Sequence, residues 1–180
     1  MKDSVIAVHE AGHALVAHAV GDRVLRVSVA PSPDGRALGA VMHAIPFTND
    51  LAYFGRRLAG LQGGRVAVAV AATTVGDATT GCDSGAREDM EAESALNPFR
   101  GGSEGRHLFA DEAAWVHFSR AWLAKTIEIL LANEVQLRRL ANALFRESDV
   151  LEGDRLDELL APVTRFEARV DPRLWRARKR

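Results

Sequence analysis

The chain has 180 residues, enough for one domain built around a single hydrophobic core. Hydrophobic residues make up 47% and charged residues 26%, ordinary values for a globular protein, so disordered and collagen-like classes are excluded. A formal net charge of -1 gives no general attraction to nucleic acid or to an anionic membrane, and we expect neither as a partner.

The single cysteine and the N-terminal stretch indicate where in the cell the protein is expected to be. Cys82 has no second cysteine to pair with, so an internal disulfide is excluded and a reducing, cytoplasmic location is expected. The apolar N-terminal stretch is interrupted by two histidines and a glutamate, which argues against both a signal peptide and a membrane span.

The first predicted element is a helix near the N-terminus. Asp3 or Ser4 can cap it, and Gly21 stands where it should end, after Val20. Because this helix is apolar on nearly all sides, we expect it to be buried. The polar side chains at positions 9, 10 and 13 then need buried partners, which a metal ion would supply.

Two strands are predicted next. Residues 23–30 are rich in valine, residues 31–35 have turn composition, and residues 37–45 form a second strand that Pro46 closes. Together they predict a small sheet, with a hairpin as its simplest form.

The remaining pattern is helical. A helix is predicted from Asp50 to about Thr74, with Gly63 and Gly64 inside it as positions that allow close helix packing. After a loop, a helix restarts near Ala86 and ends before Pro98, and beyond Asp111 the apolar residues recur at helical spacing in one long helix or two consecutive ones. The predicted fold is therefore mainly α with a small β-sheet.

The chemistry rests on the segment His9-Glu10-Ala11-Gly12-His13. Residues four apart share one helix face, so His9 and His13 can bind one zinc ion. Glu10 projects about 100° away and suits the general base that takes a proton from the zinc-bound water while the metal polarises a peptide carbonyl.

A catalytic zinc site needs a third protein ligand. Position 19 is alanine, where metzincins require a histidine, and no glutamate lies between Glu10 and Glu88, which disfavours the thermolysin-like arrangement. The residues alone leave several acids open, namely Asp22, Asp34, Asp50, Asp77, Asp83 and the cluster Glu88-Asp89-Glu91.

A resemblance narrows this choice. The chain resembles the peptidase domain of the FtsH-type ATP-dependent zinc metallopeptidases, whose helix opens His-Glu-Ala-Gly-His and whose third ligand is the aspartate of a Thr-Gly-Ala-Ser-Asn-Asp segment. Residues 84–89 align with that segment without a gap. The resemblance therefore implies a zincin-type helical domain with Asp89 as third ligand, and Asp83 as second choice.

Other segments extend the resemblance and also show departures. Residues 35–39, 61–67 and 129–160 resemble the family's strand entry, its Gly-Gly-Arg helix and its closing helices. Val68 and Ala69 stand where the family usually has paired glutamates, so support for the metal ligands from those acids is missing.

The sequence shows neither a phosphate-binding loop nor a membrane helix before the peptidase region. We therefore expect no ATPase half, and a domain that cuts peptides or already unfolded chains unless a separate ATPase partner feeds it. The resemblance implies a family that forms rings, so a homo-oligomer is included among the expectations.

Three hypotheses result. In the leading one, residues 1–162 form a zinc endopeptidase domain with a basic, poorly ordered tail at 163–180, and extended substrate pairs with the strand at Leu38, Gly39 and Val41. In the alternative, a catalytically reduced FtsH-like domain acts as a binding or adaptor module. Hydrolysis of a non-peptide amide is a third reading that the residues leave open.

Overall fold

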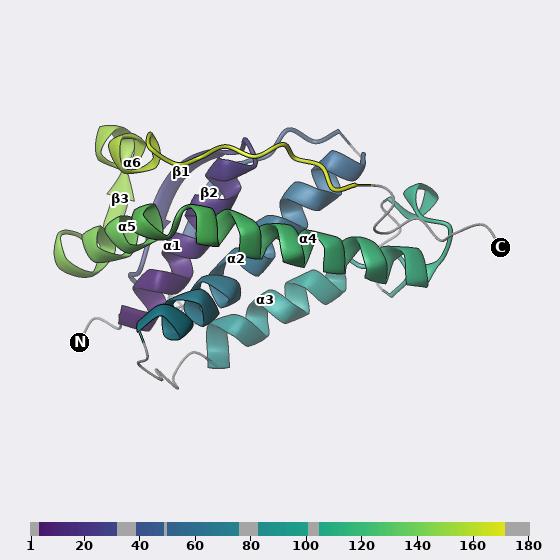
Figure 1. Cartoon of the computed structure of the whole chain (residues 1–180), viewed down its shortest axis with the longest axis horizontal. Helices are drawn as coiled ribbons and strands as arrows, with labels where there is room; N and C mark the ends of the chain where they lie inside the picture. The colour runs from purple at the N-terminus through teal and green to yellow at the C-terminus, as the bar shows by residue number, and fades with distance from the viewer. Residues whose placement is uncertain (1–3, 32–38, 49, 76–82, 101–104, 172–180) are drawn as a thin grey trace.

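The computed structural model describes residues 4–31, 39–48, 50–75, 83–100 and 105–171. Within these ranges helices dominate and three short strands form one sheet, which confirms the predicted fold class (Figure 1). The elements are α1 Ser4–Ala19, β1 Arg23–Ser28, β2 Ala40–Ala44, α2 Leu51–Val75, α3 Asp83–Ala95, a 3₁₀ turn Arg106–Leu108, α4 Glu112–Ala132, α5 Glu134–Arg146, β3 Val150–Glu152 and α6 Gly153–Leu160.

Helix α1 lies inside the molecule, as its apolar composition predicts. Leu15, Val16 and Ala17 have no exposed surface, and the helix packs against α2 and α5. Just after the helix end, Gly21 has a φ of 99°, a conformation that glycine adopts without strain. The predicted helix end is therefore confirmed, and α1 forms the centre of the core.

Helices α1 and α2 approach so closely that their backbones nearly touch. A Cβ on Gly12 would lie 2.5 Å from the carbonyl oxygen of Gly63, and a Cβ on Gly63 would lie 2.8 Å from the carbonyl oxygen of Gly12. Any larger residue at either position would push the helices apart. The glycines inside α2 thus have the packing role that the sequence predicts.

The sheet has the order β2-β1-β3, and both pairs are antiparallel. The predicted hairpin is confirmed, although β1 ends at Ser28 instead of residue 30 and β2 covers only Ala40–Ala44 of the predicted 37–45. Residues 37 and 38 lie outside the described residues. The third strand was not predicted, because three residues are too few to show an alternating pattern. Strand β2 lies at one edge of the sheet.

Helices α4 and α5 are consecutive and meet at Asn133. Three aromatic side chains of α4, Trp115, Phe118 and Trp122, are buried in the core, as their helical spacing predicts. The buried Asn133 side chain donates to the carbonyl of Ile129 at 2.9 Å, and its Oδ1 accepts from the backbone N–H of Thr164 at 2.7 Å. These bonds attach the segment after α6 to the junction between the two helices.

Residues 163–171, the first half of the predicted basic tail, run in extended form over the helices (Figure 1). The N–H of Phe166 bonds to the carbonyl of Ala19 at 2.8 Å, and the ammonium of Lys125 lies 4.7 Å from the centre of the Phe166 ring. Val163 is only 6% exposed. This part of the chain is therefore packed, and residues 172–180 lie outside the described residues.

In the part of the chain that the structure describes, no helix combines the length and the apolar character that crossing a bilayer requires.

Candidate metal centre

Helix α1 places two imidazoles side by side. His9 and His13 are one helical turn apart, and their Nε2 atoms lie 3.0 Å from each other. The Nδ1–H of His13 donates to the carbonyl oxygen of Gly60 on α2 at 2.6 Å. This bond orients the ring and leaves Nε2 of His13 available as a metal ligand.

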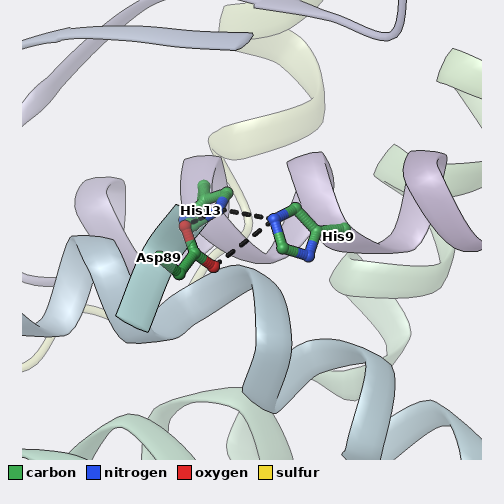
Figure 2. Close-up of side chains that lie close together, drawn as sticks. All are labelled: His9, His13 and Asp89. Carbon is green, nitrogen blue, oxygen red and sulfur yellow. Dashed lines mark hydrogen bonds and ion pairs between the residues drawn. The ribbon is translucent and has the colours of Figure 1, made fainter. Parts of the chain in front are cut away.

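Asp89 reaches the same point from α3. Its Oδ2 lies 3.4 Å from Nε2 of His9, and its Oδ1 lies 3.3 Å from Nε2 of His13. Figure 2 shows the carboxylate facing both rings. The structure therefore brings Asp89 to the predicted histidines. Asp83 begins α3 six residues earlier, about 9 Å along the helix axis, and its side chain lies outside the described residues.

The donor set fits a zinc ion. One possible ligand atom from each of His9, His13 and Asp89 lies within 4.8 Å of the others, and two imidazoles with one carboxylate are zinc ligands. Oδ2 of Asp89 is buried, and no described residue donates a hydrogen bond to it. Because a buried carboxylate oxygen without a hydrogen bond is costly, a cation beside it would remove an unfavourable feature of the site.

Gly64 keeps α2 clear of the imidazoles. A Cβ at this position would overlap the Nε2 atoms of both His9 and His13. The sequence suggested a packing role for this glycine, but its contact with the two nitrogens was not predicted. The one sequence signal for this contact is that Gly64 is the second of two consecutive glycines inside a predicted helix.

Glu10 lies next to His9 in the chain and is only 7% exposed. A Cβ on Gly39 would overlap its carboxylate, so Glu10 lies against the chain just before β2. Burial raises the pKa of Glu10 to about 7, and the negative charges of Asp89 and Glu88 add to this rise, while His13 opposes it. A carboxylate with this pKa can both take and give a proton near neutral pH.

The two imidazoles differ in their affinity for protons. Burial lowers the pKa of His9 to about 4, with a further contribution from neighbouring His13. Burial alone would also lower the pKa of His13, but the hydrogen bond and charge of Asp89, together with Glu10 and the Gly60 carbonyl, raise it above its usual value. His13 therefore holds a proton more readily than His9.

The predicted substrate-binding residues fall partly within the described chain. Gly39 touches Glu10, Val41 is half-buried and pairs with Val27 of β1, and Leu38 lies outside the described residues. No described strand pairs with the second edge of β2. The free edge of β2 therefore begins beside the buried carboxylate of Glu10, where a bound substrate strand would need to lie. Binding of substrate to this edge stays a prediction.

His43 of β2 makes a polar contact outside the candidate metal centre. Its Nδ1 lies 3.2 Å from Oδ2 of the buried Asp22, and Nε of Arg56 lies 3.5 Å from Oδ1 of the same carboxylate. Because Arg56 belongs to α2, these contacts connect β2 to the helix that carries Gly60 and Gly64.

Comparison with known families agrees with this arrangement. Residues 1–96 match the model of peptidase family M41. The chain belongs to this family. The predicted resemblance to FtsH-type peptidases is thus confirmed, and the matched region runs from α1 through α3, including all four residues of the site. No curated protein matches the chain. Family M41 is zinc-dependent, and membership indicates a zinc metallopeptidase of the FtsH type.

Proposed function

We propose that this protein is a zinc-dependent endopeptidase in which His9, His13 and Asp89 hold the ion. The observation that carries the proposal is the meeting of their ligand atoms, from two separate helices, beside the buried Glu10. When bound, zinc lowers the pKa of water and polarises the carbonyl of a peptide bond.

Glu10 is the proposed general base. Burial raises its pKa to about 7, well above that of an ordinary carboxylate, which favours uptake of a proton from the attacking water and its later return to the departing amine. The Gly60 carbonyl and Asp89 both contact His13 and orient its ring beside the proposed base.

Substrate would bind as an added strand along β2. Gly39 lies against Glu10, so a peptide paired with residues 39–41 would pass beside the proposed general base. Leu38, Gly39 and Val41 are the residues proposed to contact it. Backbone hydrogen bonds give affinity without demanding one sequence, and they require an extended segment with free N–H and C=O groups. Peptides and unfolded proteins offer such segments, and we propose them as substrates.

Exchanging Glu10 for glutamine tests the chemistry. Glu10→Gln keeps the size of the side chain but cannot take a proton, so cleavage of casein or a peptide should fall by about 10²–10⁴. Zinc content should stay that of the parent protein. Glu128→Gln, an exposed carboxylate change on α4, is the matched control and should leave cleavage unchanged.

Two results would contradict the proposed mechanism. Cleavage by Glu10→Gln at the parent rate would remove Glu10 as the base. A parent protein that binds zinc but cleaves neither casein nor peptides would instead support the adaptor alternative.

Exchanging Val41 for proline tests the substrate strand. Val41→Pro removes one backbone N–H from β2, and loss of one hydrogen bond worth about 0.5–1.5 kcal/mol should raise KM by roughly 2- to 12-fold. Met42→Ala keeps the backbone and removes an exposed side chain, so its KM should stay unchanged. Peptides N-methylated at alternate backbone positions repeat the test on the unaltered protein, and an unchanged KM in both experiments would refute strand pairing.

A further inference from the structure

Helix α3 carries Asp89 but has almost no apolar face to hold it in place. Among its described side chains, only Ala86, Asp89 and Glu93 are not exposed. Helices are normally held by an apolar stripe at this spacing, whereas two of these three side chains are acidic. The position of the helix must therefore depend on what its acids contact.

Glu93 makes three hydrogen bonds to two neighbouring helices. Its Oε1 accepts from Nε2 of Gln62 at 2.9 Å and from Oγ of Ser119 at 2.7 Å. Its Oε2 accepts from the guanidinium of Arg65 at 2.7 Å. Hydrogen bonds to a charged group are stronger than neutral ones, and these bonds attach α3 to both α2 and α4.

The same stretch of α2 that holds Glu93 also contacts the two histidines. Gly60 accepts from His13 and Gly64 borders both Nε2 atoms, while Gln62 and Arg65 in between bind Glu93. Gln62 is only 1% exposed, and its Oε1 is 3.5 Å from the hydroxyl of Thr126 on α4. Residues 60–65 of α2 therefore contact both the histidines of α1 and the Glu93 side chain of α3.

We propose that Glu93 is a positioning residue for the metal centre. Asp89 and Glu93 are one helical turn apart on the same face, so anchoring Glu93 sets the rotation and height at which Asp89 meets His9 and His13. Without the anchor, α3 shifts or frays and the third ligand leaves its place, although the core around α1 stays folded. This inference rests on the proposed function, because it assigns the third ligand to Asp89.

The test compares zinc affinity in Glu93→Ala and Glu91→Ala by competition with a chromophoric chelator. Glu93→Ala should bind zinc about 10- to 100-fold more weakly, the loss typical of removing a residue that orients a ligand. Glu91 lies on the same helix but is exposed and pairs with Arg87, so Glu91→Ala is the control and should change affinity less than threefold. Glu93→Asp, which keeps the charge, should recover part of the affinity.

A second readout separates positioning from general stability. The visible spectrum of the cobalt-substituted protein reports the ligand geometry, and it should change in Glu93→Ala but not in Glu91→Ala. Lower thermal stability with parent zinc affinity and a parent cobalt spectrum would show a merely structural role and overturn the inference. That result would leave the proposed function intact if Asp89→Ala still loses zinc, whereas a parent protein that binds no zinc would overturn both.

Discussion

The two helices that meet at the metal centre are built in opposite ways. Helix α1 supplies His9, Glu10 and His13 from inside the core, packed against α2 and α5. Helix α3 supplies Asp89 from the surface, with most of its described side chains exposed. Core packing therefore fixes the two histidines that we propose as ligands and the glutamate that we propose as base, while polar contacts determine where the proposed third ligand, Asp89, lies. Fold stability and metal affinity should respond to different substitutions.

The largest effect expected from this contrast is on folding. Leu15→Ala in α1 removes a fully buried side chain and should lower the free energy of unfolding by about 2–5 kcal/mol. Met90→Ala in α3 truncates a side chain that is 60% exposed and should change it by less than about 0.5 kcal/mol. Urea denaturation of the metal-free proteins measures both. Equal losses would show that α3 is part of the same packed core, and the contrast between the helices would fail.

The next effect is on zinc binding. Asp89→Ala removes the proposed third ligand. Loss of a residue that only orients a ligand costs about 10- to 100-fold in metal affinity, so the zinc affinity of Asp89→Ala should fall by more than that. Glu88→Ala changes the adjacent exposed carboxylate and should stay within a few-fold of the parent. Chelator competition measures both dissociation constants. Parent-like binding by Asp89→Ala would mean that another acid, with Asp83 first in order, completes the site.

The same contrast explains what could be predicted from the sequence. The signals for α1 are local. A capping residue precedes the helix, Gly21 follows it, and the two histidines stand four residues apart within an otherwise apolar stretch. Its extent, its burial and the pairing of His9 with His13 follow from these alone. The hairpin and the close packing at Gly63 were predictable for similar reasons, since turn composition and glycine position are read within a few residues.

Features that depend on distant contacts were harder to predict. The residues alone left several acids open as third ligand, because Asp89 is 76 positions from His13 and spacing says nothing about such a meeting. Only the family resemblance pointed to it. Glu93 was missed entirely, since its role depends on Gln62, Arg65 and Ser119 from two other helices. Its one local signal is its place four residues after Asp89 on a predicted helix.

The packed segment at 163–171 was missed for a further reason. Its composition is that of a charged, solvated terminus, yet two isolated apolar residues, Val163 and Phe166, dock on the helices while Asn133 binds the backbone between them.

The smallest expected effect is the dependence of zinc affinity on pH, and it separates the two histidines. The pKa of His9 is lowered to about 4, so His9 is neutral at pH 5.5 and above and releases no proton to zinc. The pKa of His13 is raised above its usual 6.5, so below that raised value zinc must displace a proton from His13. Affinity should therefore rise by about tenfold per pH unit from pH 5.5 to 6.5 and become constant once pH exceeds the raised pKa.

Glu10 also holds a proton near neutral pH, so the measurement uses the Glu10→Gln variant, in which that proton cannot contribute. This substitution also removes the smaller contribution of Glu10 to the raised pKa of His13 and leaves Asp89 as its main cause. Titration calorimetry in buffers with different heats of ionisation counts the protons released, and about one is expected at pH 6. Two protons would mean that His9 is also charged in the metal-free site, contrary to its burial. An affinity independent of pH between 5.5 and 6.5 would mean that His13 carries no proton, and that its contact with Asp89 is too weak to offset the cost of burying an imidazolium.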